Sequence, residues 1–410
     1  MTNSIRAMRL HYTDEPLATL DLPGGTLRVT RGLGSGLARR AGDPAERVWA
    51  VGDRGPNLKL PFAVERYGLE QFQRHAGLAG AKLMPFPGIG PAISELHVSD
   101  GRVECVRTIP LRDRSGRPLS GLPVPGPFSE PAFDLAGARL APDPSGADTE
   151  GIAAAADGSF WIADEYGPSL LHVAADGTVL ARHVPRGCGA AFAGAEYPVI
   201  ESLPAIAAHR QLNRGFEALA LSADGSRLYC AFQSPLAHPD EAAHRRARHV
   251  RLWAIDTATG AVTAEFLYRL DKPGSFRRDS AIGDVDRADL KLCDIAVIAP
   301  GRMLVLERGS ATAKLYAVTL DETGALDPRE RDIATRPTIE QRSAAGDSLP
   351  SLAKTLIFST DDHPEIDADL EGIALLSART LLLVNDNDFG VDGVATQFWR
   401  IDLPDGTKLE

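Results

Sequence analysis

The segment EGIAAAADGSFWIAD, residues 150–164, shows the design on which we expect the whole chain to be built. It begins with a carboxylate, continues as a short apolar run, turns at Asp157-Gly158 and ends in a second apolar run. The Asp-Gly pair favours a tight hairpin turn, because both central residues of such a turn need positive φ, which Asp and Gly accept at low cost. The segment therefore predicts a hairpin of two short, buried strands.

The same design recurs along the chain. Two close copies are EALALSADGSRLYCA at 217–231 and EGIALLSARTLLLVN at 371–385. A fourth copy, DIAVIAPGRMLVLE at 294–307, is one residue shorter at its turn. A looser fifth copy consists of SGLA at 35–38 followed by VWAVGD at 48–53. Recurrence of one hairpin indicates a repeat architecture.

Further strand pairs lie between the hairpins, at 170–184, 250–270 and 314–326. Two inner and two outer strands per repeat are typical of a β-propeller blade. We therefore predict an all-β fold, a single β-propeller domain over residues 1–410 with five or six four-stranded blades. The ring is expected to be closed by terminal strands: 397–404 together with an N-terminal strand at 5–10 or at 17–22.

Charge and composition exclude several classes of partner. The 410 residues include 44 Lys+Arg and 55 Asp+Glu, a net charge of −11, whereas nucleic-acid binding depends on Lys and Arg. The four cysteines form no CxxC pair, so no zinc or redox motif is present. No apolar run is long enough for a membrane span or a secretion signal. We expect a monomer that binds neither nucleic acid nor membrane.

In a propeller, the start of each hairpin and the end of its second strand meet at one mouth of the central channel. Two rings of equivalent positions follow from the repeat, and both are rich in carboxylates and amides. The first ring is Ser35, Glu150, Glu217, Asp294 and Glu371. The second ring is Asp53-Arg54, Asp164-Glu165, Phe232-Gln233, Glu307-Arg308 and Asn385-Asp386-Asn387-Asp388.

So many like charges in one place need compensation, because each close pair costs several kcal/mol at a partly buried site. Oxygen ligands without Cys or clustered His match a hard cation, and a flexible oxygen ring favours Ca²⁺ over Mg²⁺. The alternative is a network of salt bridges with Arg54, Arg214 and Arg308. The predicted Ca²⁺ ligands are Glu150, Glu217, Glu371, Asp53, Asn385, Asp386, Asp294 and Glu307.

Four motifs together resemble the phytase-like propeller family, described as having esterase-like activity. They are EGIAAAADGSFWIADEYGPSL, NRGFEALALSADGSRLYCAFQSPL, VGDRGPN and DLEGIALLSARTLLLVNDNDFG, and the resemblance extends from Gly32 to Phe398. It implies a hydrolase of phosphate or carboxylic esters, assisted by a divalent ion, in a family whose members are commonly exported. This chain departs from the family in showing no signal peptide, so its location stays open.

The leading hypothesis is metal-assisted hydrolysis of a small phosphoester at the channel mouth. In this hypothesis the ring carboxylates bind the ion, and the arginines donate paired hydrogen bonds to phosphate oxygens. The residues expected to be catalytic are Asp164, Glu165, Arg54, Arg214 and Arg308.

Two alternatives stay open. One is a Ca²⁺-dependent carboxylic esterase or lactonase, which His363 would favour if it reached the mouth as a general base. No GxSxG motif supports a serine hydrolase. The other is a non-catalytic propeller that binds a ligand and carries a structural ion, because propellers host both enzymes and scaffolds.

Overall fold

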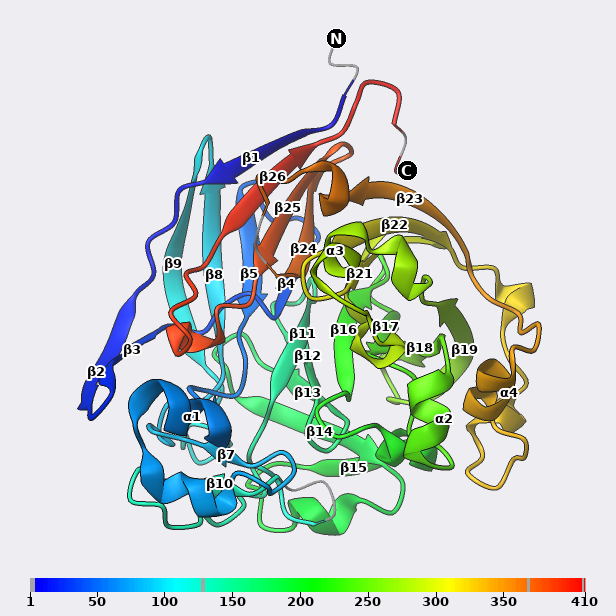
Figure 1. Ribbon diagram of the computed structural model, residues 1–410. Coiled ribbons are helices and arrows are strands. Elements are labelled where there is room, and N and C mark those ends of the chain that lie inside the picture. The colour runs from blue at the N-terminus through cyan, green and yellow to red at the C-terminus, as the bar shows by residue number, and fades with distance from the viewer. Residues whose placement is uncertain (1–3, 127–129, 367–368, 408, 410) are drawn as a thin grey trace.

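The strands of the computed structural model form five sheets of four or five strands, together with two small sheets. The structure describes residues 4–126, 130–366, 369–407 and 409. Figure 1 shows the sheets arranged around a common centre, with the first strand of each sheet innermost. The prediction of an all-β fold is confirmed.

Each large sheet begins at one of the five predicted hairpins, and its strands are mainly antiparallel. The first sheet is β4 (Gly36–Ala38), β5 (Arg47–Val51), β8 (Ala92–Ser99) and β9 (Arg102–Pro110). The second is β11 (Thr149–Ala154), β12 (Phe160–Asp164), β13 (Ser169–Val173), β14 (Val179–Pro185) and β15 (Val199–Leu203). The third is β16 (Phe216–Leu221), β17 (Arg227–Phe232), β18 (His249–Asp256) and β19 (Val262–Arg269). The fourth is β20 (Lys291–Ala299), β21 (Arg302–Arg308), β22 (Ala313–Thr319) and β23 (Ala353–Ser359). The fifth is β24 (Leu370–Ser377), β25 (Thr380–Asn385), β26 (Phe398–Asp402) and β1 (Arg6–Leu10).

The first strands of the five sheets contact one another in a cyclic order: β4, β11, β16, β20, β24 and back to β4. Glycines allow some of these strands to approach closely. A Cβ atom on Gly36 would lie 2.5 Å from the carbonyl oxygen of Glu150, and one on Gly151 would lie 2.5 Å from that of Glu217. At one end of these strands, a small cavity of about 100 Å³ is lined by residues from all five. Each first strand therefore faces a shared axis.

The two ends of the chain meet in the fifth sheet, where β1 pairs antiparallel with β26 from Arg6 opposite Asp402 to Leu10 opposite Phe398. Of the two N-terminal strands considered from the sequence, the one near 5–10 therefore joins the last sheet. The other, β2 (Pro16–Leu22), pairs with β3 (Gly25–Thr30) in a separate hairpin.

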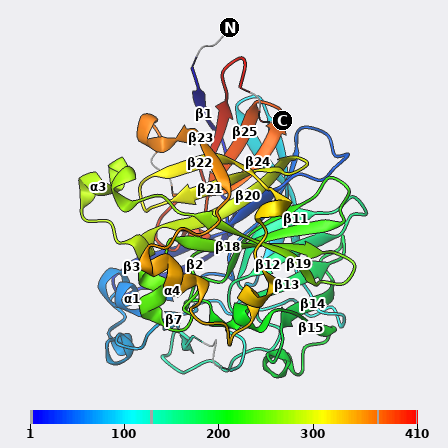
Figure 2. The same ribbon diagram turned by 90° about the vertical axis from the view of Figure 1, so that its right-hand side faces the viewer.

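Short helices lie in the connections between strands, as Figure 2 shows for α3 at the edge of the molecule. The α-helices are α1 (Leu60–Tyr67), α2 (Glu241–Arg246), α3 (Arg277–Ile282) and α4 (Ile339–Ala345). The 3₁₀ helices are η1 (Glu70–His75), η2 (Gly189–Phe192), η3 (Ala205–His209), η4 (Pro273–Ser275), η5 (Arg287–Asp289), η6 (Glu322–Gly324), η7 (Pro328–Arg331), η8 (Thr360–Asp362) and η9 (Asp388–Gly390). Three very short strands, β6 (Leu58–Lys59), β7 (Lys82–Leu83) and β10 (Ala132–Phe133), form a small sheet. Among the described residues, no helix has the length and apolar character needed to span a membrane.

Candidate functional site

A β-bulge recurs near the start of four first strands. In β16, β20 and β24, the residue without a register partner is Glu217, Cys293 and Glu371 respectively, and in β11 the register shift includes Glu150. A bulge re-aims the side chain at the point where it interrupts the ladder. The structure therefore places Cys293, and not Asp294, at the position equivalent to the three glutamates.

This corrects the sequence alignment of the fourth copy by one residue. Asp294 pairs with Leu306 in the ladder and is not among the residues that line the acidic cavity described below. Its carboxylate is fully buried and accepts backbone N–H bonds from Ile295 at 2.8 Å, Ile373 at 2.8 Å and Leu37 at 3.3 Å. Asp294 thus ties β20 to both β24 and β4 through backbone contacts.

The residues of each pair predicted for the second ring differ in whether they line a cavity. In four of the five sheets, the second residue of the pair lines one common cavity and the first does not: these residues are Glu165, Gln233, Arg308 and Asp386. In the first sheet, both Asp53 and Arg54 line the cavity, and Asp388 of the last sheet lines it as well.

Three predicted site residues precede these and point back into the sheets. Asp164 is fully buried and forms an ion pair with Arg182. Glu307 accepts hydrogen bonds from the Tyr268 hydroxyl at 2.6 Å and from a backbone N–H. Asn385 accepts a backbone N–H bond at 2.6 Å. These contacts give all three side chains structural partners outside the cavity.

The cavity has a volume of about 480 Å³, within the range of small-molecule sites. Nine carboxylates and five cationic side chains line it. The ring residues among them are Asp53, Arg54, Glu150, Glu165, Glu217, Gln233, Arg308, Glu371, Asp386 and Asp388. The others are Asn57, Leu58, Lys59, Phe62, Lys82, Asn213, Lys291, Asp369, Val391, Asp392 and Val394.

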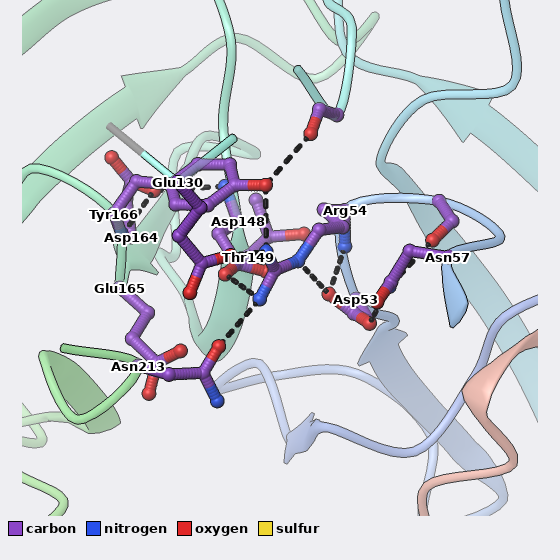
Figure 3. Close-up of polar contacts among 12 residues, drawn as sticks. Asp53, Arg54, Asn57, Glu130, Asp148, Thr149, Asp164, Glu165, Tyr166 and Asn213 are labelled. Atoms are coloured by element: carbon purple, nitrogen blue, oxygen red, sulfur yellow. Dashed lines mark hydrogen bonds and ion pairs between the residues drawn. The ribbon is translucent and has the colours of Figure 1, made fainter. Parts of the chain in front are cut away.

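Arg54 lies at the centre of a buried polar cluster, shown in Figure 3. Its guanidinium contacts Asp148 at 2.6 Å, Glu130 at 2.8 Å and Asn213 at 2.8 Å, and its Nε lies 3.3 Å from Asp53. Burial pushes the pKa of Asp53 upward, but the charge of Arg54 and hydrogen bonds outweigh it, so the pKa is lowered. Arg54 is thus engaged with protein partners on every side.

The other two predicted arginines differ in position. Arg308 lines the cavity, forms ion pairs with Glu371 and Asp369, and donates from Nε to the Cys293 sulfur at 3.1 Å. Arg214 is not among the lining residues. The salt-bridge alternative from the sequence therefore accounts for Glu371 and Asp53.

Glu150, Glu165 and Glu217 have no ion-pair partner among the described residues. One carboxylate oxygen of each lies within 4.8 Å of the others. Glu165 Oε1 and Glu217 Oε2 are buried without a hydrogen-bond partner in the described part of the chain. Burial raises the pKa of all three, and in Glu150 and Glu217 neighbouring carboxylates raise it further. These carboxylates therefore have no ion pair among the described residues, although the more distant charges of Arg54, Arg210 and Arg214 act on Glu165 and that of Lys291 acts on Glu217.

A second acidic group stands beside them. Burial and the charge of Asp388 raise the pKa of Asp386, and a short hydrogen bond joins Asp386 to Ser35 of the first ring. Asp388 is exposed at the rim. Partial enclosure, with the charges of Asp53 and Glu371, raises its pKa to about 6.

Sequence reasoning missed several residues of the site. Asp148 is fully buried beside Arg54 and Asp53, and its place two residues before Glu150 on the same strand face was the available signal. Lys59 and Lys82 come from a connection that does not follow the repeat, so no pattern pointed to them. His363 is not among the lining residues.

Comparisons with known proteins add to this geometry. A family model described as "Phytase-like: Esterase-like activity of phytase" matches residues 30–389. An uncharacterized secreted protein of Arthroderma benhamiae is 29% identical over 296 residues, a match that covers 63% of this chain and 55% of that protein. The chain therefore spans about half the length of this curated relative.

Solved structures are similar at low sequence identity. An aldose sugar dehydrogenase from Streptomyces coelicolor is 12% identical, with 98% of this chain and 99% of that chain covered and a TM-score of 0.35. A glucose dehydrogenase is 12% identical, with 98% and 100% covered and a TM-score of 0.37. A Bacteroides caccae protein of unknown function is 10% identical, with 72% and 61% covered and a TM-score of 0.30.

Proposed function

The chain belongs to the phytase-like family, and from that premise we propose that it is a metal-assisted hydrolase of small phosphoesters. We further propose that the five sheets are the blades of one five-bladed propeller. The acidic cavity then lies at one mouth of the channel formed by the first strands.

One observation carries this proposal: Glu150, Glu165 and Glu217 converge in the cavity, and none of them forms an ion pair with the described residues. Without a cation, burial favours the protonated form of all three carboxyls, and repulsion from neighbouring carboxylates adds to this in Glu150 and Glu217, so their pKa values are raised. A structural role would pair them with arginine or lysine, as Glu371 is paired with Arg308. Their arrangement is instead that of a cation site.

The donor set fits a hard divalent cation. All three donors are carboxylate oxygens, and two of these oxygens are buried without a hydrogen bond among the described residues. Carboxylate oxygens suit Ca²⁺, and variable coordination suits it better than Mg²⁺. Glu150, Glu165 and Glu217 would hold the ion, with Glu371 and Asp386 within reach of Glu150. When bound, such a cation polarises the phosphoryl group and makes water more acidic.

The protein's own residues have separate tasks. Arg54 and Arg308 are fixed by carboxylates, so they hold Asp53 and Glu371 in place and add positive potential to the cavity. Asp388, with a pKa of about 6, is largely ionised at neutral pH and accepts a proton from water at the rim. We propose Asp388 as the general base and Glu165 as a cation ligand.

A phosphoester is favoured over a carboxylic ester by two features. Five cationic side chains line the cavity beside nine carboxylates, and with a bound cation neutralising part of the acidic ring they would attract an anionic substrate. His363, the base that would have favoured a carboxylic esterase, instead lies against Phe358 with its Nδ1 3.1 Å from Glu365.

The cation is tested with purified full-length protein by elemental analysis and by thermal melting with EDTA or Ca²⁺. We expect bound Ca²⁺ and a higher Tm with Ca²⁺. Glu217→Gln should lower the metal content, whereas the exposed control Glu241→Gln should not. Unchanged metal content in Glu217→Gln would reject the cation site.

Activity is tested with an aryl phosphate, phytate, an aryl acetate and a γ-lactone, each with and without Ca²⁺. We expect Ca²⁺-dependent release from the aryl phosphate. Hydrolysis of only the acetate or lactone would make the chain a carboxylic esterase. No turnover with a Ca²⁺-stabilised protein would make it a ligand-binding propeller with a structural ion.

A further inference from the structure

One connection of the first sheet is much longer than its counterparts. Between the second and third strands, the other four sheets have connections at 165–168, 233–248, 309–312 and 386–397, whereas β5 and β8 are joined by residues 52–91. This connection contains β6, α1 and β7, and Figure 1 shows it to one side of the sheets. It brings Lys59, Phe62 and Lys82 to the acidic cavity, although none of them belongs to the repeat.

The connection is firmly held in place. Leu60, Phe72 and Leu83 are fully buried in a core that also contains Phe389 of η9. The backbone N–H of Lys82 donates to a carbonyl of the neighbouring segment at 2.9 Å. The lysines that it carries therefore project from a fixed backbone.

Lys59 and Lys82 are direct partners in the antiparallel register of β6 and β7. Residues paired in this way have Cβ atoms about 4.5–5.5 Å apart, and like charges placed there destabilise the pair. Both side chains line the cavity. Neither ammonium group forms a hydrogen bond or an ion pair with the described residues, in contrast to the guanidinium groups of Arg54 and Arg308.

The carboxylates around the two lysines do not neutralise them by direct contact. Asp392 is the acid whose pKa both lysines affect, and no ion pair within 4.0 Å joins it to either. Glu130 and Asp53 also interact with Lys82, but both are already held by Arg54. No ion pair among the described residues thus engages either ammonium group at the cavity, while burial and the charge of Arg54 lower the pKa of Lys82.

We propose that Lys59 and Lys82 form an anion clamp that binds the phosphate group of the substrate or of the product. The clamp rests on the proposed function, since it names the residues that select the substrate of that same site. Lysine is a compact point charge well suited to phosphate oxygens. Connection 52–91 would then determine specificity, while the ring carboxylates bind the cation.

The test measures binding of inorganic phosphate by calorimetry, with Ca²⁺ low enough to keep calcium phosphate in solution. The wild type is compared with Lys59→Met, Lys82→Met and the double variant, with Lys272→Met as a control at an exposed lysine outside the cavity. We expect each single variant to bind phosphate about tenfold more weakly, about the value of one charge-assisted contact. Lys82→Arg should retain most of the binding.

Thermal melting distinguishes a loss of phosphate binding from a loss of stability in the lysine variants. Phosphate should raise the Tm of the wild type and of Lys272→Met, but not that of the double variant. If the lysines only balance the nearby carboxylates, the double variant will be less stable yet bind phosphate normally, and the clamp is rejected. Absence of phosphate binding in the wild type rejects it as well, as does equally tight binding of acetate.

Failure of the clamp and failure of the proposed function give different results. Lysine-dependent phosphate binding without hydrolysis of an aryl phosphate would keep the clamp and reject the phosphoesterase. Ca²⁺-dependent hydrolysis with unchanged KM in the double variant would keep the phosphoesterase and reject the clamp.

Discussion

Arg308 donates a hydrogen bond to the carboxylate of Glu371, so this glutamate of the acidic ring already has a counter-charge within the protein. The same guanidinium also pairs with Asp369, which is half exposed. Glu150, Glu165 and Glu217 lack such a partner in the described part of the chain. The glutamates thus differ: Glu371 forms a salt bridge, whereas Glu165 and Glu217 each keep one buried oxygen without a hydrogen bond among the described residues.

Arg308→Gln tests this division. The change removes the ion-pair partner of Glu371 and Asp369. We expect the free energy of unfolding in EDTA to fall by about 3 kcal/mol, at the low end for breaking a buried pair. With Ca²⁺ present the loss should be smaller, because the cation can neutralise Glu371. Urea denaturation under both conditions measures the difference.

Arg245→Gln provides the control, because Arg245 forms an exposed ion pair with Glu241. This change should lower the free energy of unfolding by less than about 1 kcal/mol. Equal losses with EDTA and Ca²⁺ would show that Glu371 plays no part in binding the cation.

The raised pKa values predict how pH changes the benefit of Ca²⁺. A carboxyl group whose pKa is raised by folding stabilises the fold at low pH, and this stabilisation is lost as the pH rises through the raised pKa. Glu150, Glu165 and Glu217 should therefore destabilise the metal-free protein as the pH rises. We expect the gap in Tm between Ca²⁺ and EDTA to widen from pH 6.5 to about 9, above the ordinary pKa of histidine. Glu217→Gln should narrow the gap, and a gap independent of pH would contradict the assignment.

Asp388→Asn tests the proposed general base. Asp388 has a φ of 45°, a conformation that Asn also accepts, so the variant should fold normally. We expect kcat for an aryl phosphate to fall roughly 10²-fold, the usual contribution of a general base. In the wild type, kcat should decline below the pKa of about 6, and this acidic limb should vanish in the variant.

Asp100→Asn, at a fully exposed site, serves as the control. An unchanged pH profile in Asp388→Asn would assign the proton transfer to another group.

Gly151→Ala tests the close contact between β11 and β16. The added Cβ would lie 2.5 Å from the Glu217 carbonyl oxygen and 2.9 Å from the Leu219 nitrogen, so the two strands must move apart. We expect the free energy of unfolding to fall by about 1–3 kcal/mol, the usual cost of overpacking a protein core. A weaker affinity for Ca²⁺ should follow, because Glu150 and Glu217 flank this contact. Denaturation and calcium titration measure the two effects. Gly77→Ala, with open space around it, should change neither. Full stability of Gly151→Ala would show that the inner strands tolerate wider spacing.

The sequence alone was enough for the repeat. Short apolar runs and Asp-Gly turns are local signals, and five copies made the hairpins and the all-β fold predictable. The same repeat pointed to Glu150, Glu217 and Glu371 at the start of three hairpins, and all three line one cavity. Recurrence made these predictions possible because equivalent positions of a repeat occupy equivalent places.

Tertiary structure decided which neighbour faces the cavity in four of the five second-ring pairs; for example, Glu165 lines it and Asp164 does not. A bulge in β20 shifts the register by one residue, so Cys293 instead of Asp294 takes the position equivalent to the ring glutamates. No sequence pattern predicted that Lys59 and Lys82 are paired. Lys59 and Lys82 stand 23 positions apart in a connection outside the repeat, and only the pairing of β6 with β7 brings their charges together at the cavity.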